Sequence, residues 1–173
     1  MAEAKILVAR HEGVVQIRVV GRATFKISQG LREYAVPLLR SGEVKSLVIE
    51  LSECRGMDST FMGVLAMVGL EGRDGVSLVI VNANDHQKRL LTSIGVARLF
   101  HFASEPVPKA DWQSLCEVAA DTLNMKGVAG TVLSAHRTLM DLDPENIPRF
   151  RDVVDILTEE IEKSEDESNE GEQ

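Results

Sequence analysis

The strongest constraint on the fold is an alternation of short apolar runs with longer helical segments. The runs are rich in β-branched residues and have the length of buried strands: Val14–Val20, Lys45–Leu51 and Val76–Val81. The segments that follow them have helical spacing or composition, and each is followed by glycine: Ser28–Arg40, Phe61–Leu70 and Asp85–Ile94. Strands that alternate with helices predict a largely parallel sheet covered by helices.

Two shorter runs complete the predicted sheet. Ile6–Val8 is expected to pair with the strand at Val14 through a turn at Glu12-Gly13, and Arg98–Phe102 resembles a short final strand. The opening hairpin would make the sheet mixed rather than purely parallel. Pro37 lies inside the first helical segment, where we expect it to kink or shorten the helix. The sequence therefore predicts an α/β domain over residues 1–105.

After this domain the pattern becomes purely helical. Pro106 and Pro108 mark a joint, and residues 106–163 form a predicted all-α extension. Its first part, residues 111–142, carries a helical apolar stripe that Gly127 and Gly130 interrupt. Asp143-Pro144-Glu145 has the pattern of a helix start, with Asp as N-cap and Pro at the first position. That helix should run to about Lys163, and residues 164–173 are predicted to be a disordered acidic tail.

Charge and composition exclude several classes of function. The formal net charge is -8, and most of it lies after residue 158, where there are eight acidic residues and one lysine. No basic footprint for nucleic acid is present, and aromatic residues are only 4%. No apolar run approaches the roughly 20 residues that cross a bilayer. With no signal-peptide pattern, and with Cys54 and Cys116 far apart, we expect a cytoplasmic protein with two reduced thiols and no membrane partner.

One loop has the position of a functional site. Residues 52–60 connect a buried strand to an apolar helix, and sites in α/β sheets collect at the carboxyl ends of strands. Asp58, Ser59 and Thr60 have side-chain oxygens that can cap the helix, and capping alone is one interpretation. The other is a phosphorylation switch at Ser59. Phosphate there would interact favourably with the helix dipole, while Asp58 would repel it, and a docked partner would be displaced.

The residues around this loop resemble a known family. Leu47–Ser52, followed after a short gap by Met57-Asp-Ser-Thr-Phe-Met-Gly-Val-Leu65, is similar to the signature of STAS domains, which occur in sulfate transporters and bacterial anti-sigma factor antagonists. Val19-Val-Gly21 with Phe25, and Asn82 with the helix that ends at Thr92-Ser-Ile-Gly95, extend the resemblance over roughly residues 5–103. It implies a STAS-like mixed, mostly parallel sheet followed by the all-α extension.

The resemblance also implies a function as a protein-binding switch. In soluble relatives an anti-sigma-type serine kinase docks on this loop and helix and phosphorylates the serine after the aspartate, and a PP2C-like phosphatase reverses the state. Ser59 matches that phosphoacceptor, with Thr60 as the alternative. The implied partner-binding residues are Met57, Asp58, Ser59, Thr60, Phe61, Met62 and Gly63. The alternative function is a constitutive STAS subunit of a signalling or transport assembly without a phosphorylation cycle.

Some features depart from the family pattern or fall outside it. Phe61 stands where relatives have glycine, and Glu50 where many have aspartate. We expect Phe61 to lie either in the core or at the rim of the docking surface. The extension is predicted to pack as a helical cap, or to form a homodimer or a second partner surface. His101 and His136 have no metal-ligand-type residues nearby in the sequence and are predicted to be structural or solvated. No cofactor, metal or catalytic motif is present, so we predict no enzyme activity.

Overall fold

A mixed sheet forms the centre of the molecule in the computed structural model, which describes residues 4–107, 109–115 and 125–171. The strand order is β6-β5-β3-β2-β1-β7, and β4 pairs beside β2. The strands are β1 (Lys5–His11), β2 (Val14–Ala23), β3 (Ser46–Glu50), β4 (Cys54–Met57), β5 (Ser77–Val81), β6 (His101–Ala103) and β7 (Gln113–Ser114). The predicted α/β class is confirmed.

Parallel pairing dominates, as the sequence predicted. Strands β2, β3, β5 and β6 run parallel to one another, whereas β1 pairs antiparallel with β2 through the turn at Glu12 and Gly13. Both turn residues have positive φ, 48° and 80°, which suits a tight hairpin. The inward side chains of β2 and β3, among them Ile17 and Ile49, are fully buried. These two strands therefore form one side of the hydrophobic core.

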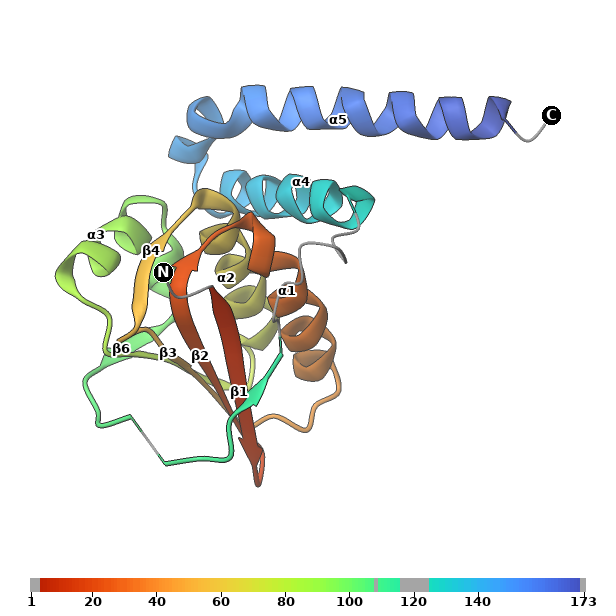
Figure 1. Ribbon diagram of the computed structural model, residues 1–173. Coiled ribbons are helices and arrows are strands. Elements are labelled where there is room, and N and C mark those ends of the chain that lie inside the picture. The colour runs from red at the N-terminus through yellow and green to blue at the C-terminus, as the bar shows by residue number, and fades with distance from the viewer. Residues whose placement is uncertain (1–3, 108, 116–124, 172–173) are drawn as a thin grey trace.

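Helices α1 (Phe25–Arg40) and α2 (Ser59–Gly72) lie side by side behind the sheet, and α3 (Asp85–Ser93) lies beyond β4 (Figure 1). Thr24 caps α1, and Asn84 forms a capping box with Gln87 at α3. Pro37 lies inside α1 without ending it, because the helix continues to Arg40. The expected shortening at Pro37 is therefore wrong, although proline supplies no amide donor to the helix.

The structure differs from the sequence prediction at three short elements. Residues 54–57, predicted as loop, form β4 alongside the end of β2. Residues 96–99 form the 3-10 helix η1 (Val96–Leu99), so the final parallel strand starts later, at His101. Residues 113–114 pair with β1 instead of starting a helix. The two strands β4 and β7 pair with segments distant in sequence, and neither has a strand pattern of its own.

The C-terminal extension consists of helix α4 (Met125–Leu142), the 3-10 helix η3 (Pro144–Asn146) and helix α5 (Ile147–Glu170). Asp143 caps η3 through the amide of Glu145, as its sequence position predicted. Helix α4 runs without a break through Gly127 and Gly130, the two glycines that interrupt the predicted apolar stripe. The first part of the predicted stripe, residues 116–124, lies outside the described residues.

The prediction of a disordered tail is wrong for residues 164–170, which belong to α5. Helix α5 continues to Glu170, seven residues beyond Lys163, with its last turns exposed to solvent. Glu and Lys are good helix formers, so the acidic composition does not by itself stop a helix that has already formed. Ser164 and Ser168 also donate hydrogen bonds to carbonyls of the preceding turn. Figure 1 shows α5 extending past the end of α4.

Candidate functional site

Asp58 joins the N-termini of two helices. Its Oδ1 accepts a hydrogen bond from the amide of Phe61 at 2.8 Å, which caps α2. Its Oδ2 accepts from the amide of Phe25 at 2.8 Å, in the first turn of α1. The Asp58 amide in turn donates to the carbonyl of Ala23. The capping interpretation of this residue therefore holds, and it applies to two helices at once.

Asp58→Ala is expected to lower the free energy of unfolding by about 1–3 kcal/mol, because two helix N-termini lose a charged acceptor. Urea denaturation followed by circular dichroism measures the effect. Asp85→Ala is the matched control, since Asp85 is an exposed first-turn aspartate in a helix that Asn84 already caps. An Asp58→Ala midpoint equal to that of the control would contradict the double-cap assignment.

Ser59, the first residue of α2, contacts a histidine from the C-terminal extension. Its Oγ lies 2.9 Å from Nε2 of His136, and Nδ1 of His136 lies 2.7 Å from the carbonyl oxygen of Val132. A carbonyl oxygen only accepts, so Nδ1 carries a proton; in the neutral imidazole Nε2 then accepts the Ser59 hydroxyl proton. Phe150 packs against the His136 ring edge-on, with ring centroids 5.1 Å apart.

The predicted partner-binding residues divide into two groups. Met57, Asp58 and Ser59 are partly exposed, whereas the next four residues are buried. Thr60 is 5% exposed, Phe61 0% and Met62 7%. Phe61 therefore belongs to the core, which decides between the two positions expected for it. Of the two hydroxyls proposed as phosphoacceptors, only that of Ser59 belongs to a residue with substantial exposure.

Helix α4 covers much of α2 and explains this burial. A Cβ added at Gly63 would lie 2.6 Å from the carbonyl oxygen of Ala135 and 2.7 Å from its Cβ, so the two helices approach closely at this glycine. Ala135 is 0% exposed and His136 is 4% exposed. Figure 1 shows α4 lying across one end of the α/β domain, with α5 packed on its outer side. The predicted packing of the extension as a cap matches this arrangement.

A second polar cluster lies at the carboxyl ends of β3 and β5. Glu50 is 1% exposed, and its Oε1 accepts hydrogen bonds from the Ser52 amide and the Asn82 side chain. Its Oε2 lies 3.4 Å from Nε of Arg18, whose other nitrogen pairs with Glu53. Asn82 has φ 61° and exchanges two hydrogen bonds with the backbone of Glu105. The cluster fastens the segment after β6 to the sheet and is structural.

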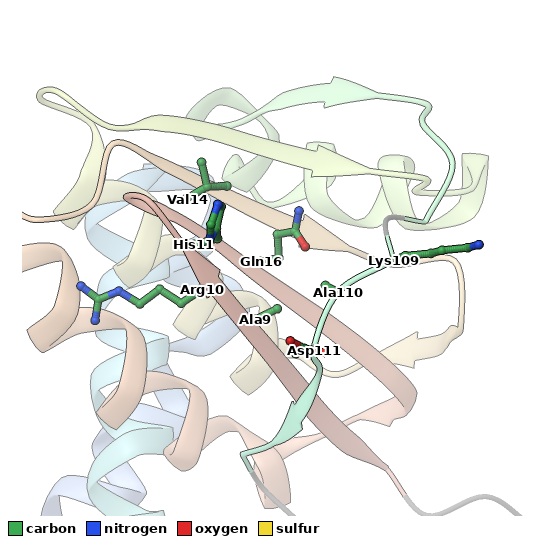
Figure 2. Close-up of a pocket in the computed structure, with 8 residues that line it drawn as sticks. All are labelled: Ala9, Arg10, His11, Val14, Gln16, Lys109, Ala110 and Asp111. Carbon is green, nitrogen blue, oxygen red and sulfur yellow. The ribbon is translucent and has the colours of Figure 1, made fainter.

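Other features of the described chain offer no competing site. A hollow of about 520 Å³ lies between the first hairpin and residues 109–111. Figure 2 shows the residues that line it, among them His11 and Asp111. This hollow lies at the start of β2, whereas Ser59 lies near the opposite end of β2, two residues after Met57, which pairs with Ala23. Among the described residues, no group of three or more His, Cys, Asp or Glu could hold a metal ion.

The remaining predictions concern the cysteines, a membrane span and the histidines. The Cys54 thiol is free and buried, and burial raises its pKa, which agrees with an unreactive structural cysteine. Cys116 lies outside the described residues. No helix among those described is long and apolar enough to cross a membrane. His101 is exposed, as predicted for a solvated histidine, but His136 is part of the site and was missed.

The comparisons with known proteins identify the family. A family model described as the MlaB STAS domain matches residues 6–101, which is more than half of the chain. The chain belongs to the STAS domain family. The matched region of this STAS protein ends in β6, so both helices of the C-terminal extension lie outside it. A search of curated proteins found no match.

The comparison with solved structures supports the fold through one of them. The unphosphorylated form of the anti-sigma factor antagonist SpoIIAA is 13% identical, covers 60% of this STAS protein and 90% of its own chain, and gives a TM-score of 0.51. The phosphorylated form of the Bacillus cell fate determinant SpoIIAA is 16% identical, covers 58% and 92%, and gives a TM-score of 0.49. At this level of identity the likeness of the unphosphorylated form concerns the fold alone, and α4 and α5 are additions to the STAS domain.

Proposed function

We propose that this STAS protein is a protein-binding switch of the anti-sigma factor antagonist kind, controlled by reversible phosphorylation of Ser59. The observation that carries the proposal is the placement of Ser59. It is the partly exposed first residue of α2, next to an aspartate that fixes the loop, whereas Thr60 beside it is 5% exposed. Ser59 is therefore more accessible than Thr60 to a serine kinase that binds this loop.

Helix α2 gives a phosphate on Ser59 a favourable electrostatic environment. The positive end of the α2 dipole lies at this residue, and a phosphate adds about -1.5 to -2 charges there. In the reaction the Ser59 Oγ bonds to the γ-phosphorus of ATP, its proton leaves, and the bond to ADP breaks. The added charge beside Asp58 would repel a partner docked on this loop. The proposed partners are an anti-sigma-type serine kinase and a PP2C-like phosphatase, in the cytoplasm.

The proposed function is binding rather than catalysis, although Ser59 and His136 form a Ser–His pair. In serine hydrolases the nucleophile opens onto a substrate cavity with oxyanion donors. Here His136 is 4% exposed and packed against Phe150, and its Nδ1 bonds to a backbone carbonyl within its own helix. Neither residue lines the hollow of Figure 2 or the one between α1 and α4.

Phosphorylation in vitro tests the proposal. The full chain is incubated with ATP and, one at a time, with the serine kinases of the anti-sigma type from its source organism, and its intact mass is measured. We expect a gain of one phosphate that Ser59→Ala abolishes and that the neighbouring Thr60→Ala keeps. No gain with any of these kinases, together with an unchanged partner set for Ser59→Asp, would refute the switch.

A constitutive subunit of a larger assembly is the second candidate function. The observation that favours it is the outer face of α5, where Val153 is 38% and Ile156 57% exposed. Such apolar side chains could contact a second copy or another subunit. Ile156→Glu would then lower the oligomeric mass measured by light scattering, whereas the exposed Asp155→Ala would leave it unchanged. A monomer for the parent chain would count against this candidate.

A further inference from the structure

One face of α2 carries both Ser59 and the contacts with α4. Ser59, Gly63 and Met67 are spaced four residues apart, so they lie on the same side of the helix. Ser59 contacts His136, Gly63 contacts Ala135, and Met67 lines the hollow that Gly130 and Thr131 also line. The α4 residues from 130 to 136 therefore follow the Ser59 face of α2.

Polar contacts outside α2 hold this arrangement in place. Asn146 donates hydrogen bonds to the carbonyls of Ile94 and Leu139, and it is 0% exposed. Arg98 pairs with Asp143 at 3.0 Å. Arg149 donates to the carbonyl of Ser93. Helix α4 itself buries apolar side chains, namely Val128, Leu133, Ala135 and Leu139. The extension is therefore docked on the STAS domain through a continuous interface.

We propose that α4 and a phosphate on Ser59 exclude one another, so that α4 is an inhibitory segment built into the chain. The proposal rests on the function proposed for Ser59 and adds its regulation. In the closed form seen here, α4 packs beside Ser59 and leaves it only partly exposed, so α4 slows the access of a kinase to Ser59. Once Ser59 is phosphorylated outside this form, α4 cannot return to its place.

The chemistry of the Ser59–His136 contact gives the physical reason. Phosphorylation removes the hydroxyl proton that Nε2 of His136 accepts at 2.9 Å. It also places three further oxygens and their charge in an interface where α2 and α4 approach within contact distance at Gly63. His136 cannot swing away freely, because its ring packs on Phe150 and its Nδ1 bonds to Val132. A phosphate that α4 partly shields from water, beside an imidazole nitrogen that accepts rather than donates, is costly, so α4 separates from α2 instead.

Coupling of this kind acts in both directions. If phosphate on Ser59 weakens the docking of α4, then any change that weakens the docking of α4 makes Ser59 more accessible by a corresponding factor. A substitution on α4 at the interface should therefore expose Ser59, although it leaves α2 unchanged. Ala135→Asp is such a change, since Ala135 is fully buried against Gly63. Arg137→Ala is its control, because Arg137 is exposed on the same helix.

Site-directed phosphoserine tests the first direction without any kinase. Phosphoserine is introduced at position 59 of the full chain by amber suppression, and amide hydrogen exchange is followed by mass spectrometry. We expect amides of residues 128–142 to exchange at least about tenfold faster, with β3 and β5 unchanged. Phosphoserine at Ser77, which is exposed at the start of β5, should leave α4 protected. Equal or stronger protection of α4 in the position-59 protein, as a phosphate held by His136 would give, overturns the proposal.

Thiol labelling tests the second direction and remains decisive if the phosphoserine protein fails to fold. In a Ser59→Cys chain, alkylation by iodoacetamide is read at position 59 by peptide mass spectrometry. We expect Ala135→Asp to raise this rate at least about tenfold, and Arg137→Ala to leave it unchanged. Equal rates in the three proteins overturn the proposal. Neither measurement uses a kinase. A failed kinase assay would therefore count against the proposed function, and it would not change the result of either measurement.

Discussion

Phe61→Ala is expected to destabilise the chain by about 3–5 kcal/mol, which is the range for truncating a fully buried phenylalanine. Phe61 is 0% exposed, and it is among the largest side chains that are completely buried. Although the residue sits in the loop-and-helix motif of the STAS family, its side chain points into the core. Denaturation in urea measures the loss as a lower midpoint with a similar slope.

Phe25→Ala provides the matched control for this prediction. Phe25 is 40% exposed at the start of α1, and its contact with Asp58 uses its amide rather than its ring. We expect a change below about 1 kcal/mol for this exposed site. If Phe61→Ala were as mild as Phe25→Ala and instead altered partner binding, then Phe61 would belong to a docking surface and its assignment to the core would be wrong.

Gly63→Ala is the second substitution with a large expected effect. The added methyl group would lie 2.6 Å from a backbone oxygen of α4, so the helices must separate. We expect a loss of about 1–3 kcal/mol, as for other overpacked sites. Hydrogen exchange should show the loss first in α4, with the central strands of the sheet affected least.

Gly130→Ala is the same chemical change at an open position. A Cβ added at Gly130 meets no atom within 4 Å, and Gly130 lies inside α4. Alanine is the better helix former, so this variant should be more stable by about 0.5–1 kcal/mol. Two Gly→Ala changes of opposite sign would separate close packing from helix propensity. A stabilising Gly63→Ala would contradict the contact between α2 and α4.

The strands that could be predicted from the sequence are those that are rich in β-branched residues. Val14–Val20, Lys45–Leu51 and Val76–Val81 are buried and β-branched, and each appears in the sheet within a few residues of its expected bounds. The strand at Cys54–Met57 was not predicted, because Cys-Arg-Gly-Met has no alternation. It forms because β2 offers an open edge next to Gly21. The sequence of residues 54–57 alone does not show that this edge of β2 is available for pairing.

The candidate site was predicted in part. Asp58 and Ser59 were placed at a helix start from their position after a strand, and α2 begins at Ser59. The role of His136 could not be predicted, because it lies 77 residues further along the chain and shares no spacing motif with Ser59. The small residues Gly63 and Ala135 were a weak signal of close helix packing. Only their contact in the fold shows which helices approach each other.

The phosphorylation state of Ser59 in its own cells tests the central claim most directly. The tryptic peptide from Gly56 to Arg73 contains two hydroxyl residues, Ser59 and Thr60, and fragment masses distinguish them. The chain is purified from growing and from stressed cells, and the peptide is measured in both. We predict phosphate on Ser59 in a fraction of the chains that differs between the two states. An observed peptide that carries no phosphate on Ser59 in either state would contradict the proposed switch.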